Sequence, residues 1–198
     1  MERFLPRYLS ALAGVLEAAE ATRLDGGCIP LDQAIANVAG QIEIVKQADR
    51  KVMFIGNGGS AGIASHMAVD FTRNGGVSGL AFNDGAALTC IGNDFGYEEV
   101  FRLQIAAHAR KDDLLFAISS SGRSANILRA VGAARERGCS IVTLSGFTPD
   151  NPLRSLGDLN LYVPSNQYGL VEISHLALIH AALDLAMGWQ GQVMTAKP

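Results

Sequence analysis

A run of hydroxyl side chains, Ser119-Ser120-Ser121-Gly122-Arg123-Ser124, follows an apolar segment and precedes a helical pattern. Serine hydroxyls and the free backbone N–H groups of a helix N-terminus donate hydrogen bonds to anions, and the helix dipole favours negative charge. A plain helix cap accounts for one serine, Ser124, and leaves the other three without a role. The segment therefore predicts a site for a phosphate group.

A second turn, Gly56-Asn57-Gly58-Gly59-Ser60, also stands between an apolar run and a helical pattern. Glycine lets the backbone approach a ligand, and the following helix N-terminus favours an anion. The turn lacks the lysine of a P-loop and the spacing of a dinucleotide fingerprint. It fits either a ligand contact or a tight strand-to-helix turn that serves the fold alone.

Two groups of ionisable residues lie on predicted helices. His66 and Asp70 are four residues apart, so both face the same side, either as ligands for a metal or substrate or as an ordinary surface pair. The last helix carries Glu172, His175 and His180 among apolar neighbours, so these polar groups need partners. Glu172 and His180 are about 12 Å apart along the axis. One ion reaches both only through a long reach or a local bend, unless Glu172 serves a neighbouring subunit. For His175 we favour a packing or interface role.

The elements that position these residues follow from the apolar patterns. Two helices, over 2–24 and 32–48, are predicted on either side of a break at 26–30. Beyond them, strands alternate with helices. The predicted strands are 52–55, 79–82, 114–119, 140–144 and 160–163, and the predicted helices are 60–73, 85–92, 97–109, 124–137 and 169–187.

This alternation predicts an α/β fold of three αβα layers around a mainly parallel five-stranded sheet, with its ligand site beyond the carboxyl ends of the strands. We expect one domain over 1–198, made of an N-terminal helical pair (1–48) and an α/β core (49–198). The helical pair has broad apolar faces, which could cover the sheet or pair with another subunit.

Composition narrows the class of protein. The chain has 198 residues, 48% of them hydrophobic and 18% charged, with a formal net charge of −3. It therefore folds, and it has no general attraction to nucleic acid or a membrane surface. Cys28, Cys90 and Cys139 form no CxxC pair, as expected of reduced thiols in a cytoplasmic protein. The pattern of the N-terminus predicts a helix of the mature protein. No run of about 18 uncharged apolar residues occurs, so no membrane span is predicted.

Four segments together resemble the phosphoheptose isomerases of the SIS (sugar isomerase) superfamily: GNGGSAGIASHMAVDF, IGNDFGYEEVF, AISSSGRSANIL and EISHLALIH. The serine turn occurs throughout SIS domains and implies phosphosugar binding, whereas the other segments are more specific. The resemblance spans nearly the whole chain. It implies a ketose–aldose phosphate isomerase that converts sedoheptulose 7-phosphate to D-glycero-D-manno-heptose 7-phosphate, as a homotetramer with zinc or another divalent metal and no nucleotide cofactor.

The resemblance also assigns roles to residues. The implied substrate contacts are Asn57, Gly58, Gly59, Ser60, Asn93, Asp94, Ser119, Ser120, Ser121, Ser124 and Glu172. The implied metal ligands are His66, Asp70, Glu172 and His180, with Asp70 and His180 as the acid/base pair and Glu172 as a further catalytic group. The family normally has Glu where this chain has Asp70, and Gln where it has Glu172.

The implied chemistry suits these residue types. Isomerisation moves a proton between neighbouring carbons through an enediol and needs a base and an acid, while a divalent metal can polarise the carbonyl oxygen. The alternative is a non-catalytic SIS protein that senses phosphosugars or associates with a replication initiator. Retention of His66, Asp70 and His180 favours the enzyme, because a binding protein has no need for all three.

Overall fold

The computed structural model describes residues 3–189 and 191, and its centre is a seven-stranded sheet. The strands are β1 (Glu20–Arg23), β2 (Cys28–Ile29), β3 (Lys51–Gly56), β4 (Ser78–Ala81), β5 (Leu114–Ser119), β6 (Ser140–Ser145) and β7 (Leu159–Tyr162). Their order is β2-β1-β7-β6-β5-β3-β4. Strands β3 to β7 are parallel, while β1 is antiparallel to both β7 and β2.

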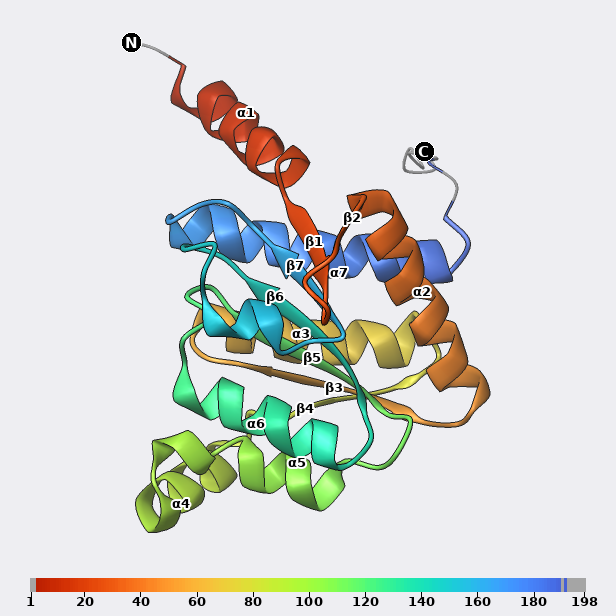
Figure 1. The fold of residues 1–198 in the computed structure, drawn as a ribbon, viewed down its shortest axis with the longest axis vertical. Coiled ribbons are helices and arrows are strands. Elements are labelled where there is room, and N and C mark those ends of the chain that lie inside the picture. The colour runs from red at the N-terminus through yellow and green to blue at the C-terminus, as the bar shows by residue number, and fades with distance from the viewer. Residues whose placement is uncertain (1–2, 190, 192–198) are drawn as a thin grey trace, which may run out of the picture.

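Helices cover both faces of this sheet (Figure 1). They are α1 (Phe4–Glu17), α2 (Leu31–Gln47), α3 (Gly59–Arg73), α4 (Gly85–Phe95), α5 (Arg102–His108), α6 (Ala125–Glu136) and α7 (Tyr168–Ala186), with short 3-10 turns η1 (Tyr97–Glu99) and η2 (Pro152–Ser155). Alternate strand residues point to opposite faces, so Phe54 and Phe116 pack with α2, α3 and α7, whereas Met53 and Leu115 pack with α5 and α6. The predicted three-layer αβα fold with a mainly parallel sheet is confirmed, but the predicted number of five strands is wrong, because β1 and β2 extend the sheet beyond β7 to seven strands.

The prediction of a helix over 2–24 is wrong beyond residue 17. Residues 20–23 form β1, and the predicted break at 26–30 contains β2. The segment Glu20-Ala21-Thr22-Arg23 buries only its two central side chains and pairs with β7, which lies far away in the sequence. The predicted helix over 97–109 is also divided, into η1 and α5, because Val100 and Phe101 between them turn into the core.

Helix α1 projects from the molecule and packs on it through Val15 and Leu16 and against α7. It leaves the body at one corner (Figure 1), and none of its residues is buried. Phe4, Leu5 and Leu9 are more than half exposed. An isolated helix of this length is marginal in water, so its apolar side chains need a surface outside the described chain.

Helix α7 is the most apolar helix of the described residues. It alone among them has the length and the mean hydropathy, 1.4, of a segment that could cross a membrane. However, 44% of that window is buried inside the molecule, where α7 packs on α2 and α3. The core helix of a globular protein meets the same criterion.

Candidate active site

The two predicted ligand turns meet at one edge of the sheet. Strands β3 and β5 are parallel neighbours, so the turns that follow them lie side by side. From β3 the chain proceeds outward to β4, and from β5 it proceeds the other way to β6. Parallel sheets bind ligands at such a reversal of strand order. A cavity of about 130 Å³ occupies this point, lined by Asn57, Ser60, Ile118, Ser119, Ser120, Ser121, Ser124, Tyr168 and Glu172.

The serine turn presents its hydroxyls to this cavity. Ser124 occupies the N-cap position of α6 but makes no side-chain capping bond, and its Oγ lies 3.3 Å from Ser119 Oγ. Gly122 has φ +62°, and a Cβ there would lie 2.0 Å from Asn151 Oδ1. The turn therefore requires glycine, and it leaves hydroxyls and N–H groups at a helix N-terminus for an anion.

The backbone of the glycine turn packs closely against neighbouring groups and leaves no room for a side chain at two of its glycines. A Cβ on Gly56 would lie 2.5 Å from the backbone oxygen of Ser60. The Glu172 carboxylate lies so close to Gly59 that a Cβ on Gly59 would meet Oε2 at an impossibly short distance. Gly56 and Gly59 therefore leave no room for a side chain, and Gly58 has φ +54°. Asn57 and Ser60 of the same turn line the cavity, and all four residues from Asn57 to Ser60 stay predicted ligand contacts.

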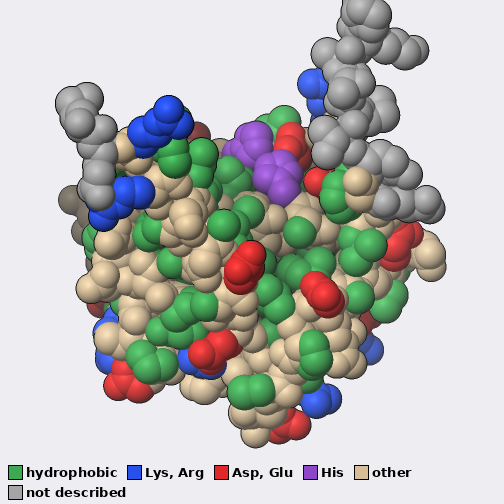
Figure 2. Space-filling model, turned by 90° about the horizontal axis from the view of Figure 1, so that it is seen from above, with side chains coloured by type: hydrophobic (Ala, Val, Ile, Leu, Met, Phe, Trp, Pro, Cys, Tyr) green, Lys and Arg blue, Asp and Glu red, His purple; other side chains and the backbone are tan. Residues whose placement is uncertain are grey.

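Helices α3 and α7 carry a second group of polar side chains. His66 Nε2 lies 3.2 Å from His180 Nε2, and Asp70 Oδ2 lies 3.4 Å from the first and 3.8 Å from the second. These two helices run parallel, because Gly59 faces Glu172 at one end and His66 meets His180 further along. Histidine side chains gather at one place on the face shown in Figure 2, open to solvent. The tertiary fold thus brings His180 of α7 next to the His66–Asp70 pair of α3.

Three predicted residues lie away from that group. Glu172 lines the serine cavity and is not within ligand distance of the two histidines. Asn93 and Asp94 are exposed on α4, where Asn93 Nδ2 donates to Asp94 Oδ1 at 2.9 Å. None of the cavity-lining residues comes from α4. The described chain alone therefore does not unite Asn93 and Asp94 with the serine turn.

His175 is a core residue. It is fully buried, and its Nε2 lies 3.0 Å from the backbone oxygen of Ser145, to which it donates as the neutral ring. Burial lowers the pKa of this imidazole to about 4.

Three polar residues of the site were not predicted from the sequence. Tyr168 lies in the cavity wall, and Tyr97 and Asn126 hydrogen-bond to Asn57. The only sequence signal for Asn126 is its place in the first turn of the helix after the serines.

Comparison with known proteins identifies the class. The sequence model of the SIS domain family matches residues 7–146, and the chain belongs to this family. A phosphoheptose isomerase from Rhodospirillum rubrum is 39% identical over 166 residues, which are 81% of this chain and 86% of that protein. Another, from Aliarcobacter butzleri, is 40% identical over 162 residues, 79% of this chain and 83% of that protein.

Solved structures agree with these relatives. A phosphoheptose isomerase from Neisseria gonorrhoeae is 30% identical with a TM-score of 0.74, covering 92% of this chain and 96% of that one. The structure of a phosphoheptose isomerase from Francisella tularensis has a TM-score of 0.78 at 27% identity, covering 92% and 95%. Within the SIS domains, this chain is a member of the phosphoheptose isomerase family and an enzyme of the aldose–ketose isomerase class.

Proposed function

We propose that this enzyme interconverts sedoheptulose 7-phosphate and D-glycero-D-manno-heptose 7-phosphate. The observation that carries the proposal is the arrangement along α3 and α7: a hydroxyl-lined cavity at one end and a His–Asp–His cluster further along. The first suits a phosphate and the second suits proton transfer at the other end of a sugar. The names of the relatives at 39 and 40% identity supply the seven-carbon substrate.

In this mechanism the serine turn binds the phosphate and thereby orients the reacting carbons, which lowers the entropic part of the barrier. Asp70 uses Oδ2 to face the two imidazoles. Its Oδ1 has no partner among the described residues. We therefore propose that this oxygen is the base that takes the carbon-bound proton. His180 serves the carbonyl oxygen as the acid. Glu172, in the serine cavity, is a contact for the sugar and a further candidate base.

The residues present also fit a divalent metal. One atom each of His66, Asp70 and His180 lie within 4.8 Å of one another, and two imidazoles with one carboxylate are a common ligand set of catalytic zinc. Nitrogens bound at about 2.05 Å in a tetrahedral site are roughly 3.3 Å apart, close to the separation of the two Nε2 atoms. A bound ion would polarise the carbonyl oxygen of the substrate. Glu172 joins this set only through a bend of α7 or from a neighbouring copy.

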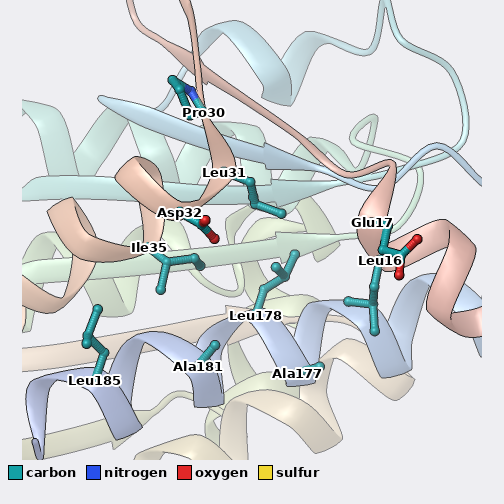
Figure 3. A pocket seen from close by; sticks show the side chains of 10 residues that line it. All are labelled: Leu16, Glu17, Pro30, Leu31, Asp32, Ile35, Ala177, Leu178, Ala181 and Leu185. Atoms are coloured by element: carbon teal, nitrogen blue, oxygen red, sulfur yellow. The ribbon is translucent and has the colours of Figure 1, made fainter. Parts of the chain in front are cut away.

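We further propose a homotetramer in the cytoplasm. The exposed apolar residues of α1 need a partner, and a groove of about 750 Å³ between the end of α1, the start of α2 and α7 offers an apolar surface (Figure 3). Leu16, Leu31, Ile35 and Leu178 line this groove. Two exposed free cysteines, Cys28 and Cys90, suit a reducing compartment. Light scattering that gives a stable 21 kDa monomer at micromolar concentration would overturn the oligomer.

The test of the function is incubation with sedoheptulose 7-phosphate, followed by chromatographic separation of ketose from aldose. We expect the aldose to accumulate with wild type, and His180→Ala to lose most turnover. His108→Ala is the matched control, since His108 is exposed on α5 beside Phe82, away from the cluster. No product from wild type, with and without added zinc, would refute the proposed reaction and leave the non-catalytic alternative.

A further inference from the structure

The amide of Asn57 is held by a reciprocal pair of hydrogen bonds. Asn57 Nδ2 donates to Asn126 Oδ1 at 3.0 Å, and Asn126 Nδ2 donates back to Asn57 Oδ1 at 2.9 Å. Such a pair is equally satisfied when both amides are turned over, because each presents one oxygen and one nitrogen. The direction in which Asn57 points must therefore come from a third group.

A backbone N–H supplies that direction. The N–H of Ile127 lies 3.0 Å from the Asn126 side chain, and a backbone N–H can only donate. The Asn126 atom that it meets is therefore Oδ1. This choice places Asn126 Nδ2 against Asn57 Oδ1. The hydroxyl of Tyr97, 3.0 Å from the same Oδ1, must then donate as well.

The segment that carries Tyr97 is also bound to α6, close to Asn126. Glu99, two residues later, is buried and accepts hydrogen bonds from Arg102 and Arg129. Burial opposes its charge, but the two guanidinium groups outweigh burial and hold the pKa of Glu99 below its usual value. Arg129 is three residues after Asn126, on the same face of α6. One face of α6 therefore carries both Asn126 and the arginine that binds Glu99 of the same 3-10 turn as Tyr97.

The hydrogen-bonding capacity of Asn57 is then almost filled. Its Oδ1 accepts from Asn126 and Tyr97, and one Nδ2 hydrogen goes to Asn126. The second Nδ2 hydrogen has no acceptor among the described residues, and Asn57 lines the serine cavity. We propose that Tyr97 and Asn126 are positioning residues that lock the Asn57 amide so that it offers an N–H donor to the ligand. Asn57 thereby selects a ligand oxygen that accepts a hydrogen bond, such as a phosphate or carbonyl oxygen, over a ligand N–H group, which can only donate. This inference rests on the proposed function.

Tyr97→Phe tests the relay because it removes only the hydroxyl. Loss of one donor to Oδ1 lets the amide rotate, and we expect KM for sedoheptulose 7-phosphate to rise about three- to tenfold. We expect kcat to stay within about twofold, since a contact made equally in ground and transition states affects only KM. Tyr8→Phe is the control, because Tyr8 lies on α1, does not line the serine cavity and has no hydrogen bond to a described residue. An unchanged KM in Tyr97→Phe would overturn the relay.

A second measurement decides the inference without activity. In protein labelled with ¹⁵N-asparagine, the side-chain amide signals of Asn57, assigned by their loss in Asn57→Asp, should shift in Tyr97→Phe and stay in Tyr8→Phe. Asn126→Asp, which places an acceptor against Asn57 Oδ1, should shift them further. Unmoved Asn57 signals in Tyr97→Phe would refute the relay even in an active enzyme. If wild type does not isomerise the sugar, the proposed function fails, and these signals alone decide the positioning roles.

Discussion

Replacing Glu172 by Gln should tighten phosphosugar binding. The Glu172 carboxylate lines the same cavity as the four serines, so a phosphate bound there meets a like charge. A cavity of 130 Å³ is about 6 Å across, and two unit charges about 6 Å apart repel by roughly 3 kcal/mol at an effective dielectric constant of about 20. Glu172 is half-buried, so solvent screens part of this repulsion. We therefore expect a gain of about 1–2 kcal/mol, or roughly five- to thirtyfold in Kd.

The assay is calorimetric titration with heptitol 7-phosphate, the reduced sugar, which cannot isomerise. A phosphate monoester carries about one charge at pH 5 and about two at pH 8, so the gain from Glu172→Gln should be larger at pH 8. Glu136→Gln is the control: Glu136 is exposed at the end of α6, and its replacement changes the net charge by the same amount. Equal or weaker binding by Glu172→Gln at pH 8 would show that the carboxylate does not face the phosphate.

Three further predictions follow from the site and its supports. Ser121→Ala and Ser124→Ala should each weaken heptitol 7-phosphate binding by about 1.5–3 kcal/mol, measured by the same titration. Gly122→Ala should lower the free energy of unfolding in urea by at least about 1–2 kcal/mol, because φ is +62° and no room exists for Cβ. Because the folded pKa of His175 is about 4, below the ordinary 6.5, the unfolded chain binds more protons between these values. Stability should therefore fall by about 3 kcal/mol as pH drops from 6.5 to 4, and this slope should be smaller in His175→Gln.

Much of the fold could be predicted because its strands are buried on both faces. A short apolar run that ends at a glycine, as over 52–55, is typical of a strand inside a parallel sheet, and the bounds of β5 were predicted to the residue. The hairpin of β1 and β2 could not be predicted in this way. Ala19 and Ala21 continue the apolar spacing of α1, and what makes Glu20–Arg23 a strand is the edge of β7, a partner more than 130 residues away.

For the candidate site too, groups of residues close together in the sequence could be predicted, whereas contacts between distant segments could not. Local sequence identified the serine turn and the His66–Asp70 pair, because each is a short run on one element. The axial rise of a helix also placed Glu172 too far from His180 for easy sharing of an ion, and the structure puts Glu172 in the serine cavity. Tyr97 and Asn126 were missed, because their role depends on hydrogen bonds across 40 and 69 residues to Asn57.

The parallel packing of α3 on α7 has a consequence for substrate size. Gly59 to His66 and Glu172 to His180 span about 10 and 12 Å of unbroken helix. The distance between the serine turn and the His66–Asp70–His180 cluster is therefore fixed by these two helices. In the proposed reaction, with the phosphate in the serine turn, a sugar with fewer carbons would leave its carbonyl short of Asp70 and His180. The backbone of two core helices then sets the number of carbons that the site prefers. Exchanging side chains around the cavity would not make such an enzyme accept a pentose phosphate.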